Sequence, residues 1–71
     1  MYVIEQWNGR RGEDSWDWII AGFPTLQQAS DWCYTQNPTD GKKILSIEKA
    51  FDIYHVEGDN VVLIPFPWEN Q

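Results

Sequence analysis

One segment of this 71-residue chain carries clear helix signals, and the rest of the fold has to be arranged around it. Thr25 is followed three residues later by Gln28, the spacing of a capping box, in which each side chain bonds the free backbone N–H of the other residue. Asn37 ends the segment, because the residue before Pro38 is disfavoured in the α region. At helical spacing the apolar face holds Leu26, Ala29, Trp32, Cys33 and Gln36, and the opposite face holds Gln27, Asp31 and Thr35. The pattern predicts one amphipathic helix, N-capped by Thr25, docked on a sheet.

Strand patterns precede this helix. Residues Tyr2 to Asn8 are rich in strand-forming side chains, with Val3 and Trp7 on one face. The polar stretch 8–14 contains two glycines, as hairpin loops commonly do. From Ser15 to Gly22, period-two alternation places Trp16, Trp18 and Ile20 on one face, with Asp17, Ile19 and Ala21 on the other. The sequence therefore predicts an N-terminal hairpin whose second strand carries an aromatic strip.

Further strand patterns follow the helix. Lys43 to Ala50 predicts a third strand, and Phe51 to Glu57 either continues it or follows a bend. The turn at 58–60 separates two apolar runs, so a C-terminal hairpin is expected. Because proline donates no backbone hydrogen bond, residues 65–71 are predicted to leave the sheet as an extended tail. These elements predict a single α+β domain over residues 1–71: an antiparallel sheet of four or five strands in the order ββαβββ, with one helix packed on one face.

Composition restricts the possible partners. Eleven carboxylates against five basic residues give a net charge of −6, which disfavours direct binding to nucleic acid or anionic membranes. The same charge favours encounter with a protein that has a basic surface, although solubility alone also accounts for acidity. A lone cysteine forms no internal disulfide, and we find neither a signal peptide nor an apolar stretch of membrane-spanning length. We therefore expect a cytoplasmic protein.

Catalytic and metal sites are poorly supported by the residues present. Cys33 and His55 are the one possible nucleophile pair, but Cys33 falls on the apolar helix face, where burial raises a thiol pKa. One His and one Cys do not supply a four-ligand metal site, and no Gly-rich loop opens a helix as a phosphate site would require. Glu13, Asp14 and Asp17 could form a carboxylate pair but read better as solvated loop acids. We expect a protein that is not an enzyme and holds no cofactor or metal.

The placement of the acids and tryptophans suggests a binding surface. Basic residues occur mainly as the pairs Arg10-Arg11 and Lys42-Lys43, so whole faces could be left with carboxylates that imitate a row of phosphates. Trp7 and Trp32 are expected in the core, whereas Trp68, beyond two prolines, is either an exposed anchor or folded back over a sheet edge. The predicted partner-binding residues are Glu13, Asp14, Asp17, Asp31, Glu48, Asp52, Trp16, Trp18 and Trp68. If the helix covers the face of Trp16 and Trp18, those two belong to the core instead.

The hairpin, the segment Phe23-Pro24-Thr25-Leu26-Gln27-Gln28-Ala29 that opens the helix, and the strands after it resemble the architecture of small phage and prophage accessory proteins. That resemblance implies a protein that binds and blocks one host protein, as anti-CRISPR and other anti-defence inhibitors do. The function expected is an acidic inhibitor that occupies a basic, nucleic-acid-binding surface of a host protein. The alternative is an assembly module that self-associates, for example as a homodimer, through a sheet edge, an aromatic patch or the tail.

Overall fold

A computed structural model describes residues 1–10, 12 and 14–68, with residues 19–21 described by their backbone only. In chain order the elements are β1 (Tyr2–Trp7), β2 (Trp16–Phe23), α1 (Leu26–Tyr34), β3 (Thr39–Asp40), β4 (Lys43–Ile44), α2 (Ile47–Ala50), β5 (Phe51–Glu57) and β6 (Asn60–Ile64). Four strands form one antiparallel sheet in the order β2-β1-β5-β6, and β3 and β4 form a small separate hairpin. The α+β class and the antiparallel sheet with a helix on one face are thus confirmed.

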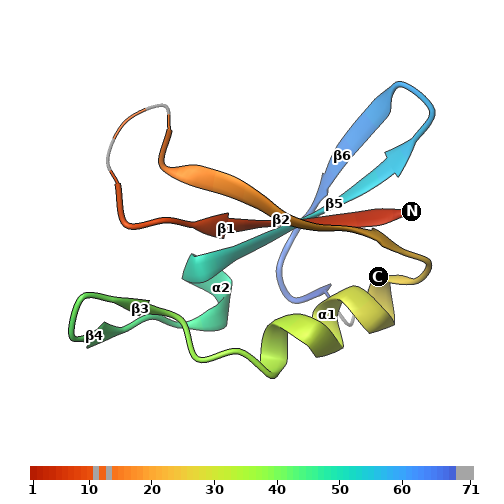
Figure 1. Ribbon diagram of the computed structural model, residues 1–71. Helices are drawn as coiled ribbons and strands as arrows, with labels where there is room; N and C mark the ends of the chain where they lie inside the picture. Colours follow the sequence, from red (N-terminus) through yellow and green to blue (C-terminus); the bar gives the residue numbers. More distant parts are fainter. Residues whose placement is uncertain (11, 13, 69–71) are drawn as a thin grey trace.

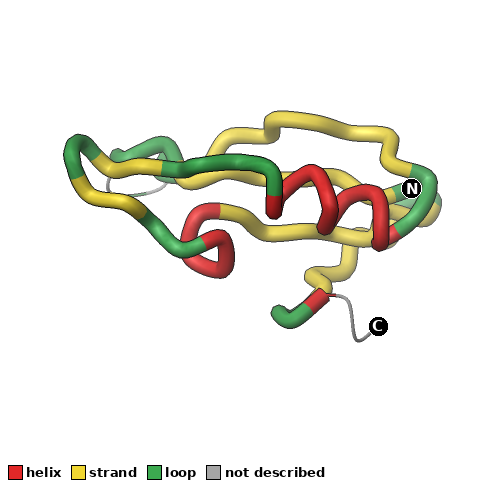
Figure 2. Tube along the Cα trace, turned by 90° about the horizontal axis from the view of Figure 1, so that it is seen from below, coloured by secondary structure: helices red, strands yellow, loops and turns green. Residues whose placement is uncertain are grey.

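Both helices lie on the same side of the sheet. Figure 1 shows α1 and α2 below the strands, while the turn of the β5–β6 hairpin and the β1–β2 loop rise on the other side. Seen from below, in Figure 2, the helices stand in front of the strands. The sheet therefore has one face covered by helices and one face that no described element covers.

Helix α1 forms for the predicted reason. Thr25 is extended, with a φ of −131°, and its hydroxyl accepts a hydrogen bond of 3.1 Å from the Gln28 backbone N–H. Ala29 and Cys33 are buried, and Asp31 on the opposite side is exposed and accepts a 2.8 Å hydrogen bond from the Gln27 side chain. The helix ends at Tyr34, three residues before Asn37, where the sequence predicted its end. The amphipathic pattern therefore identified the docking face correctly.

The core lies between the helices and the covered face of the sheet. Its fully buried side chains are Ile4, Ala29, Cys33, Ala50, Phe51, Ile53 and Trp68. Trp32 is half-buried at the rim of this cluster and meets the Phe51 ring edge-on, with 5.6 Å between ring centroids. One large aromatic side chain from the end of the chain thus completes a core that the strands and helices alone leave unfilled.

Of the two alternatives predicted for Trp68, the exposed anchor is wrong, since only 1% of its surface is exposed. After Ile64 the chain turns back to the helix side, and the Trp68 indole packs edge-on against Tyr34 and Phe66, at centroid distances of 6.1 and 5.2 Å. A domain this small has limited apolar burial, and enclosing the large Trp68 indole adds substantially to it. Residues 65–68 therefore fold back rather than extending away, and residues 69–71 of the predicted tail lie outside the described residues.

The predicted strand from Lys43 to Ala50 is also wrong. Within this segment only Lys43–Ile44 pairs as a strand, the short β4, and Ile47–Ala50 forms the helical turn α2. Ser46 caps that turn, because its hydroxyl accepts a hydrogen bond of 3.4 Å from the Lys49 backbone N–H. A capping serine thus outweighed the alternation of apolar residues around it. Strand β5 then begins after this bend, and the predicted C-terminal hairpin is present as β5 and β6.

Two bulges in β2 change the predicted face assignment. Ile4 pairs with Ile20 and Glu5 with Trp18, so one extra residue, Ile19, interrupts the ladder. A second extra residue is Gly22, whose φ of +98° is unfavourable for residues with a side chain. Period-two alternation through β2 is therefore broken at Ile19: Trp16 and Trp18 share a face as predicted, whereas the register places Ile20 on the other face.

Candidate functional site

The sheet face opposite α1 and α2, called the open face here, is the most distinctive surface of the molecule. Side chains alternate along each strand, so the neighbours of buried Ile4 and Ile53 point to this side. Strand register assigns the open face Val3, Glu5 and Trp7 of β1, Trp16 and Trp18 of β2, Asp52, Tyr54 and Val56 of β5, and Val61 and Leu63 of β6. Trp18 is 60% exposed and Leu63 50%. Large apolar side chains on the open face are therefore exposed to water.

Two carboxylates lie in the middle of this face. Glu5 pairs directly with Asp52 across β1 and β5, and directly with Trp18 across β1 and β2. The Tyr54 hydroxyl donates a hydrogen bond of 3.2 Å to Glu5 Oε1. The rings of Tyr54 and Trp18 are in contact over β1, with centroids 5.3 Å apart and planes inclined by 57°. We call these four residues, Glu5, Trp18, Asp52 and Tyr54, the acid–aromatic centre.

Burial and negative charge both act on the acid–aromatic centre. Partial burial raises the pKa of Asp52 above its usual value. Burial also raises the pKa of Tyr54 to about 12, and the charges of Glu5 and Asp52 and the hydrogen bond to Glu5 add to that rise. Both carboxylates thus oppose the appearance of a further negative charge on the tyrosine. A positively charged group would be favoured at the same position.

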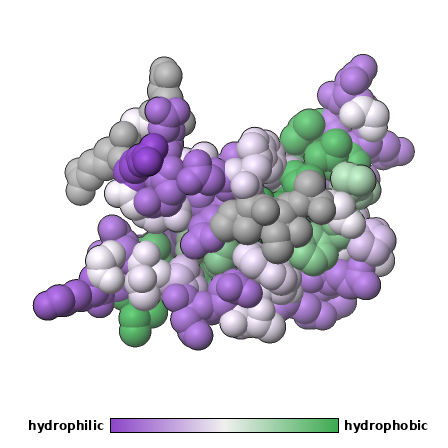
Figure 3. All heavy atoms as spheres, viewed as in Figure 1, coloured by the Kyte–Doolittle hydropathy of each residue, from purple (hydrophilic) through white to green (hydrophobic). Residues whose placement is uncertain are grey.

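A second aromatic pair lies at the end of β1. Trp7 and Trp16 are paired across the strands and meet edge-on, with 6.0 Å between centroids. Both are half-buried, so Trp7 does not belong to the fully buried core in which it was expected. Because the helices cover the other face, Trp16 and Trp18 belong to the open face, and the aromatic-patch alternative applies to them. Figure 3 shows the polar and apolar zones of the molecule in the same orientation, with apolar residues gathered toward the β5–β6 arm.

The acids predicted from sequence do not form one continuous surface. Among the predicted acids that the structure describes, only Asp52 lies on the open face. Asp14 is exposed in the β1–β2 loop, and Asp17 pairs with Gln6 on the other side of the sheet. Asp31 and Glu48 are exposed on α1 and α2, and Glu13 lies outside the described residues. The row of phosphate-like carboxylates expected along one face is thus split between the two sides of the sheet.

Sequence reasoning missed Glu5 and Tyr54. One signal was present, because Glu5 is a charged residue between Val3 and Trp7 on a strand face that is otherwise apolar. The pairing of Glu5 with Asp52 depends on the register between β1 and β5, which sequence patterns did not supply. The centre is therefore a product of long-range strand pairing.

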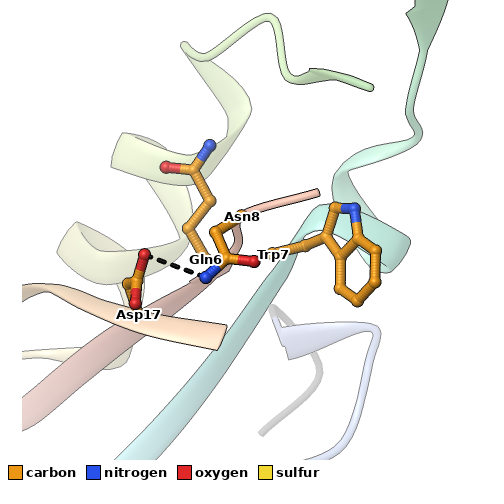
Figure 4. A pocket seen from close by; sticks show the side chains of 4 residues that line it. All are labelled: Gln6, Trp7, Asn8 and Asp17. Carbon is orange, nitrogen blue, oxygen red and sulfur yellow. Dashed lines mark hydrogen bonds between the residues drawn. The ribbon is translucent and has the colours of Figure 1, made fainter. Parts of the chain in front are cut away.

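A shallow hollow adjoins the second aromatic pair. Gln6, Trp7, Asn8 and Asp17 line a cavity of about 210 Å³, in which the Asn8 side chain donates a 3.2 Å hydrogen bond to Asp17. Figure 4 shows that Trp7 points away from Gln6 and Asp17, so these side chains do not close around a common space. Pockets that enclose small molecules commonly measure about 300 to 1,000 Å³. The hollow is smaller than such pockets, and its lining side chains do not enclose it.

The one nucleophile considered from sequence is inert in this fold. Cys33 is fully buried, and burial raises its pKa to about 12, so the thiol stays protonated at neutral pH. The His55 ring instead stacks on Tyr2, with centroids 4.6 Å apart. In the described part of the chain, no three His, Cys, Asp or Glu side chains gather in a way that could hold a metal ion. Nor do residues 1–10, 12 and 14–68 contain a helix long and apolar enough to cross a membrane.

Comparisons of the chain with protein-family models, curated proteins and solved structures gave no match. Function therefore has to be inferred from the residues of the open face.

Proposed function

We propose that this protein is a non-catalytic binding module that docks its open face on a basic surface of a partner protein. The observation that carries this proposal is the position of Glu5 and Asp52, which face each other across two strands in an apolar and aromatic surface. Like charges directly opposite each other destabilise a sheet, and Asp52 is additionally disfavoured by partial burial. The Tyr54 hydroxyl partly compensates Glu5 through its hydrogen bond, and a bound cation would stabilise both carboxylates.

An arginine side chain of the partner matches the acid–aromatic centre best. Its planar guanidinium can bond two carboxylate oxygens at once and can stack on an aromatic ring. Glu5 and Asp52 supply the oxygens, and Trp18, 60% exposed, supplies an accessible ring. Cation–π contacts contribute about 0.5 to 2 kcal/mol, more as the site is desolvated. Around this anchor, Val61 and Leu63 add exposed apolar surface of the kind that excludes water from an interface centre.

The other acids have a separate role in this proposal. Asp14, Asp31 and Glu48 are exposed but lie away from the acid–aromatic centre, so they contribute to the net charge of −6 rather than to direct contacts. A field of that sign raises the rate of encounter with basic proteins and weakens as salt screens it. Surfaces that bind nucleic acid are basic, because their Lys and Arg side chains neutralise phosphates. The role we favour is therefore that of an inhibitor of a host nucleic-acid-binding protein, of the anti-CRISPR or other anti-defence type, acting in the cytoplasm.

An NMR titration with a nona-arginine peptide tests where basic ligands bind. The five indole N–H signals report on different places: Trp16 and Trp18 on the open face, Trp7 at its end, Trp32 at the helix rim and Trp68 in the core. The proposal predicts that the Trp18 signal shifts most and that Trp32 and Trp68 shift little. Shifts centred on amides of α1 and α2, around Asp31 and Glu48, would contradict it and indicate attraction by net charge alone.

A competition experiment tests the inhibitor role separately. A partner captured with the protein should release it when nucleic acid is added, because both would occupy the same basic surface. Simultaneous binding of the protein and nucleic acid with no mutual weakening would rule out that role while leaving the open-face interaction intact.

A further inference from the structure

The two outer strands of the sheet differ in how well they are protected against pairing with another chain. Strand β2 carries two bulges and the charged residue Asp17, devices that twist an edge and discourage pairing. Strand β6 pairs with β5 residue for residue from Asn60 to Ile64 without a shift. Its sequence, Asn60-Val61-Val62-Leu63-Ile64, contains no charge, glycine or proline. The β6 edge is therefore regular, neutral and open.

Apolar side chains of β6 meet water on both faces of the sheet. Val61 and Leu63 on the open face are 55% and 50% exposed, and Val62 on the helix side is 56% exposed. A continuous apolar run of this kind is typical of strands that are covered on both sides and paired on both edges. On β6 one edge is paired with β5, and the other is the outer edge of the sheet. An exposed, flat, hydrophobic edge strand is a template for pairing with another strand.

We propose that β6 pairs with β6 of a second copy of this chain, antiparallel about a two-fold axis near Val62. In this arrangement Asn60 lies opposite Ile64 of the second copy, and the two four-stranded sheets join into one of eight strands. This inference does not depend on the proposed function.

Charge distribution favours a second copy and sets the direction of pairing. A chain with a net charge of −6 can approach its own copy most easily through a neutral surface, and β6 is such a surface. The acidic residues nearest to it, Glu57 and Asp59, lie at the hairpin turn at one end of the strand. Antiparallel pairing places the two acidic turns at opposite ends of the paired strands, about 17 Å apart for five residues at about 3.4 Å each. Parallel pairing would place them side by side, where they repel.

Such a dimer would also make the open face bivalent. A two-fold axis that pairs antiparallel edges runs perpendicular to the sheet, so the same face of both copies points in one direction. The exposed side chains of Val61 and Leu63 would then line the junction between the two copies. A dimer would therefore present two acid–aromatic centres on a single surface.

Charge substitutions at the axis test this pairing with the full chain. Val62→Lys and Val62→Glu each place two like charges together at the axis, so each variant alone should be monomeric by sedimentation equilibrium, while the parent has twice the monomer mass. Mixing the two variants should restore the doubled mass as a heterodimer, since the opposed charges then attract. Higher salt should strengthen association of the parent, because it screens the repulsion between two acidic chains.

A matched control is Ile44→Lys, which adds a charge at a residue 80% exposed on β4, and this variant should stay dimeric. Thermal melts of all variants check that the fold is intact, as expected for exposed positions. A parent that is monomeric at high concentration and high salt would overturn the inference. The inference would also be overturned if the single Val62 variants dimerised as the parent does. The same holds if both variants were folded monomers and their mixture stayed monomeric.

Discussion

The two faces of the sheet are built from the same strands but have opposite energetic characters. On the covered face, Ile4 and Ile53 are fully buried beneath α1 together with Trp68, which folds back from the chain end. On the open face, the alternate residues Glu5 and Asp52 are carboxylates set opposite each other, and Trp18 remains 60% exposed. Burial on the first face stabilises the fold, whereas partial burial of a charge on the second opposes it. The covered face therefore maintains the structure, and the open face is the surface to which we assign the proposed interaction.

The largest expected effect comes from removing the covered-face tryptophan. Trp68→Ala should lower the free energy of unfolding by about 3 to 5 kcal/mol, because it empties a fully enclosed site. Its counterpart Trp18→Ala, on the open face, should cost roughly 1 kcal/mol or less, mainly from the lost contact with Tyr54. Urea unfolding measures both. Equal losses for the two variants would remove the distinction between the faces.

Trp32 provides an intermediate case. Its ring is half-buried and contacts Phe51 edge-on, so Trp32→Ala should lower the free energy of unfolding by about 2 kcal/mol, less than a fully buried tryptophan. The same urea experiment measures it. A loss as large as that of Trp68→Ala would mean that the Trp32 side chain is more fully buried between α1 and the sheet than the structure indicates.

Cys33 should matter for packing and not for chemistry. Cys33→Ala should cost about 1 kcal/mol for a small buried cavity and leave binding to the nona-arginine peptide unchanged. In the native protein the thiol, with its pKa raised to about 12, should react with iodoacetamide only when the fold opens. Rapid labelling without unfolding, or loss of binding in a folded variant, would return this residue to consideration as a functional group.

The smallest effect concerns the charge of Asp52. Because its pKa is raised in the folded state, its contribution to stability is fully present at low pH and is lost as pH rises through the folded pKa. Asp52→Asn should therefore melt slightly higher than the parent at pH 7, and the gain should shrink as pH falls through the raised pKa of Asp52 toward its ordinary value of 3.8. Solvent screens this half-exposed group, so the difference will be small. A variant less stable than the parent at pH 7 would show that the carboxylate stabilises the fold.

The sequence predicted the parts of the fold that depend on local chemistry. Thr25 and Gln28 mark the helix start, and the turn at 58–60 marks the C-terminal hairpin, because caps and turns act over a few residues. The strand expected from Lys43 to Ala50 failed where a local capping signal at Ser46 competed with apolar alternation. Of the two predictions for Trp68, only the one in which the tail folds back was correct. Sequence alone could not decide between them, because the contacts of a tail depend on the space that distant elements leave.

The candidate site was harder to predict than the fold. Trp16, Trp18 and Asp52 were named from sequence. The extra residue Ile19 places Trp18 on the face opposite to that of Ile20, and no sequence pattern signals this bulge. The acid–aromatic centre assembles residues from three strands whose register is set by burial of Ile4 and Ile53 on the other face. Surface charge was visible in the sequence, but its division between the two faces was not.

The claim that the open face is the binding surface is tested most directly by two variants that remove equal charge from opposite sides of the sheet. Glu5→Gln with Asp52→Asn neutralises the acid–aromatic centre, and Asp31→Asn with Glu48→Gln neutralises two exposed acids on the helices. Affinity for the nona-arginine peptide, measured by calorimetry at fixed salt, should fall at least tenfold for the first variant and less than threefold for the second. Equal losses for both variants would contradict the account and show that net charge alone determines binding.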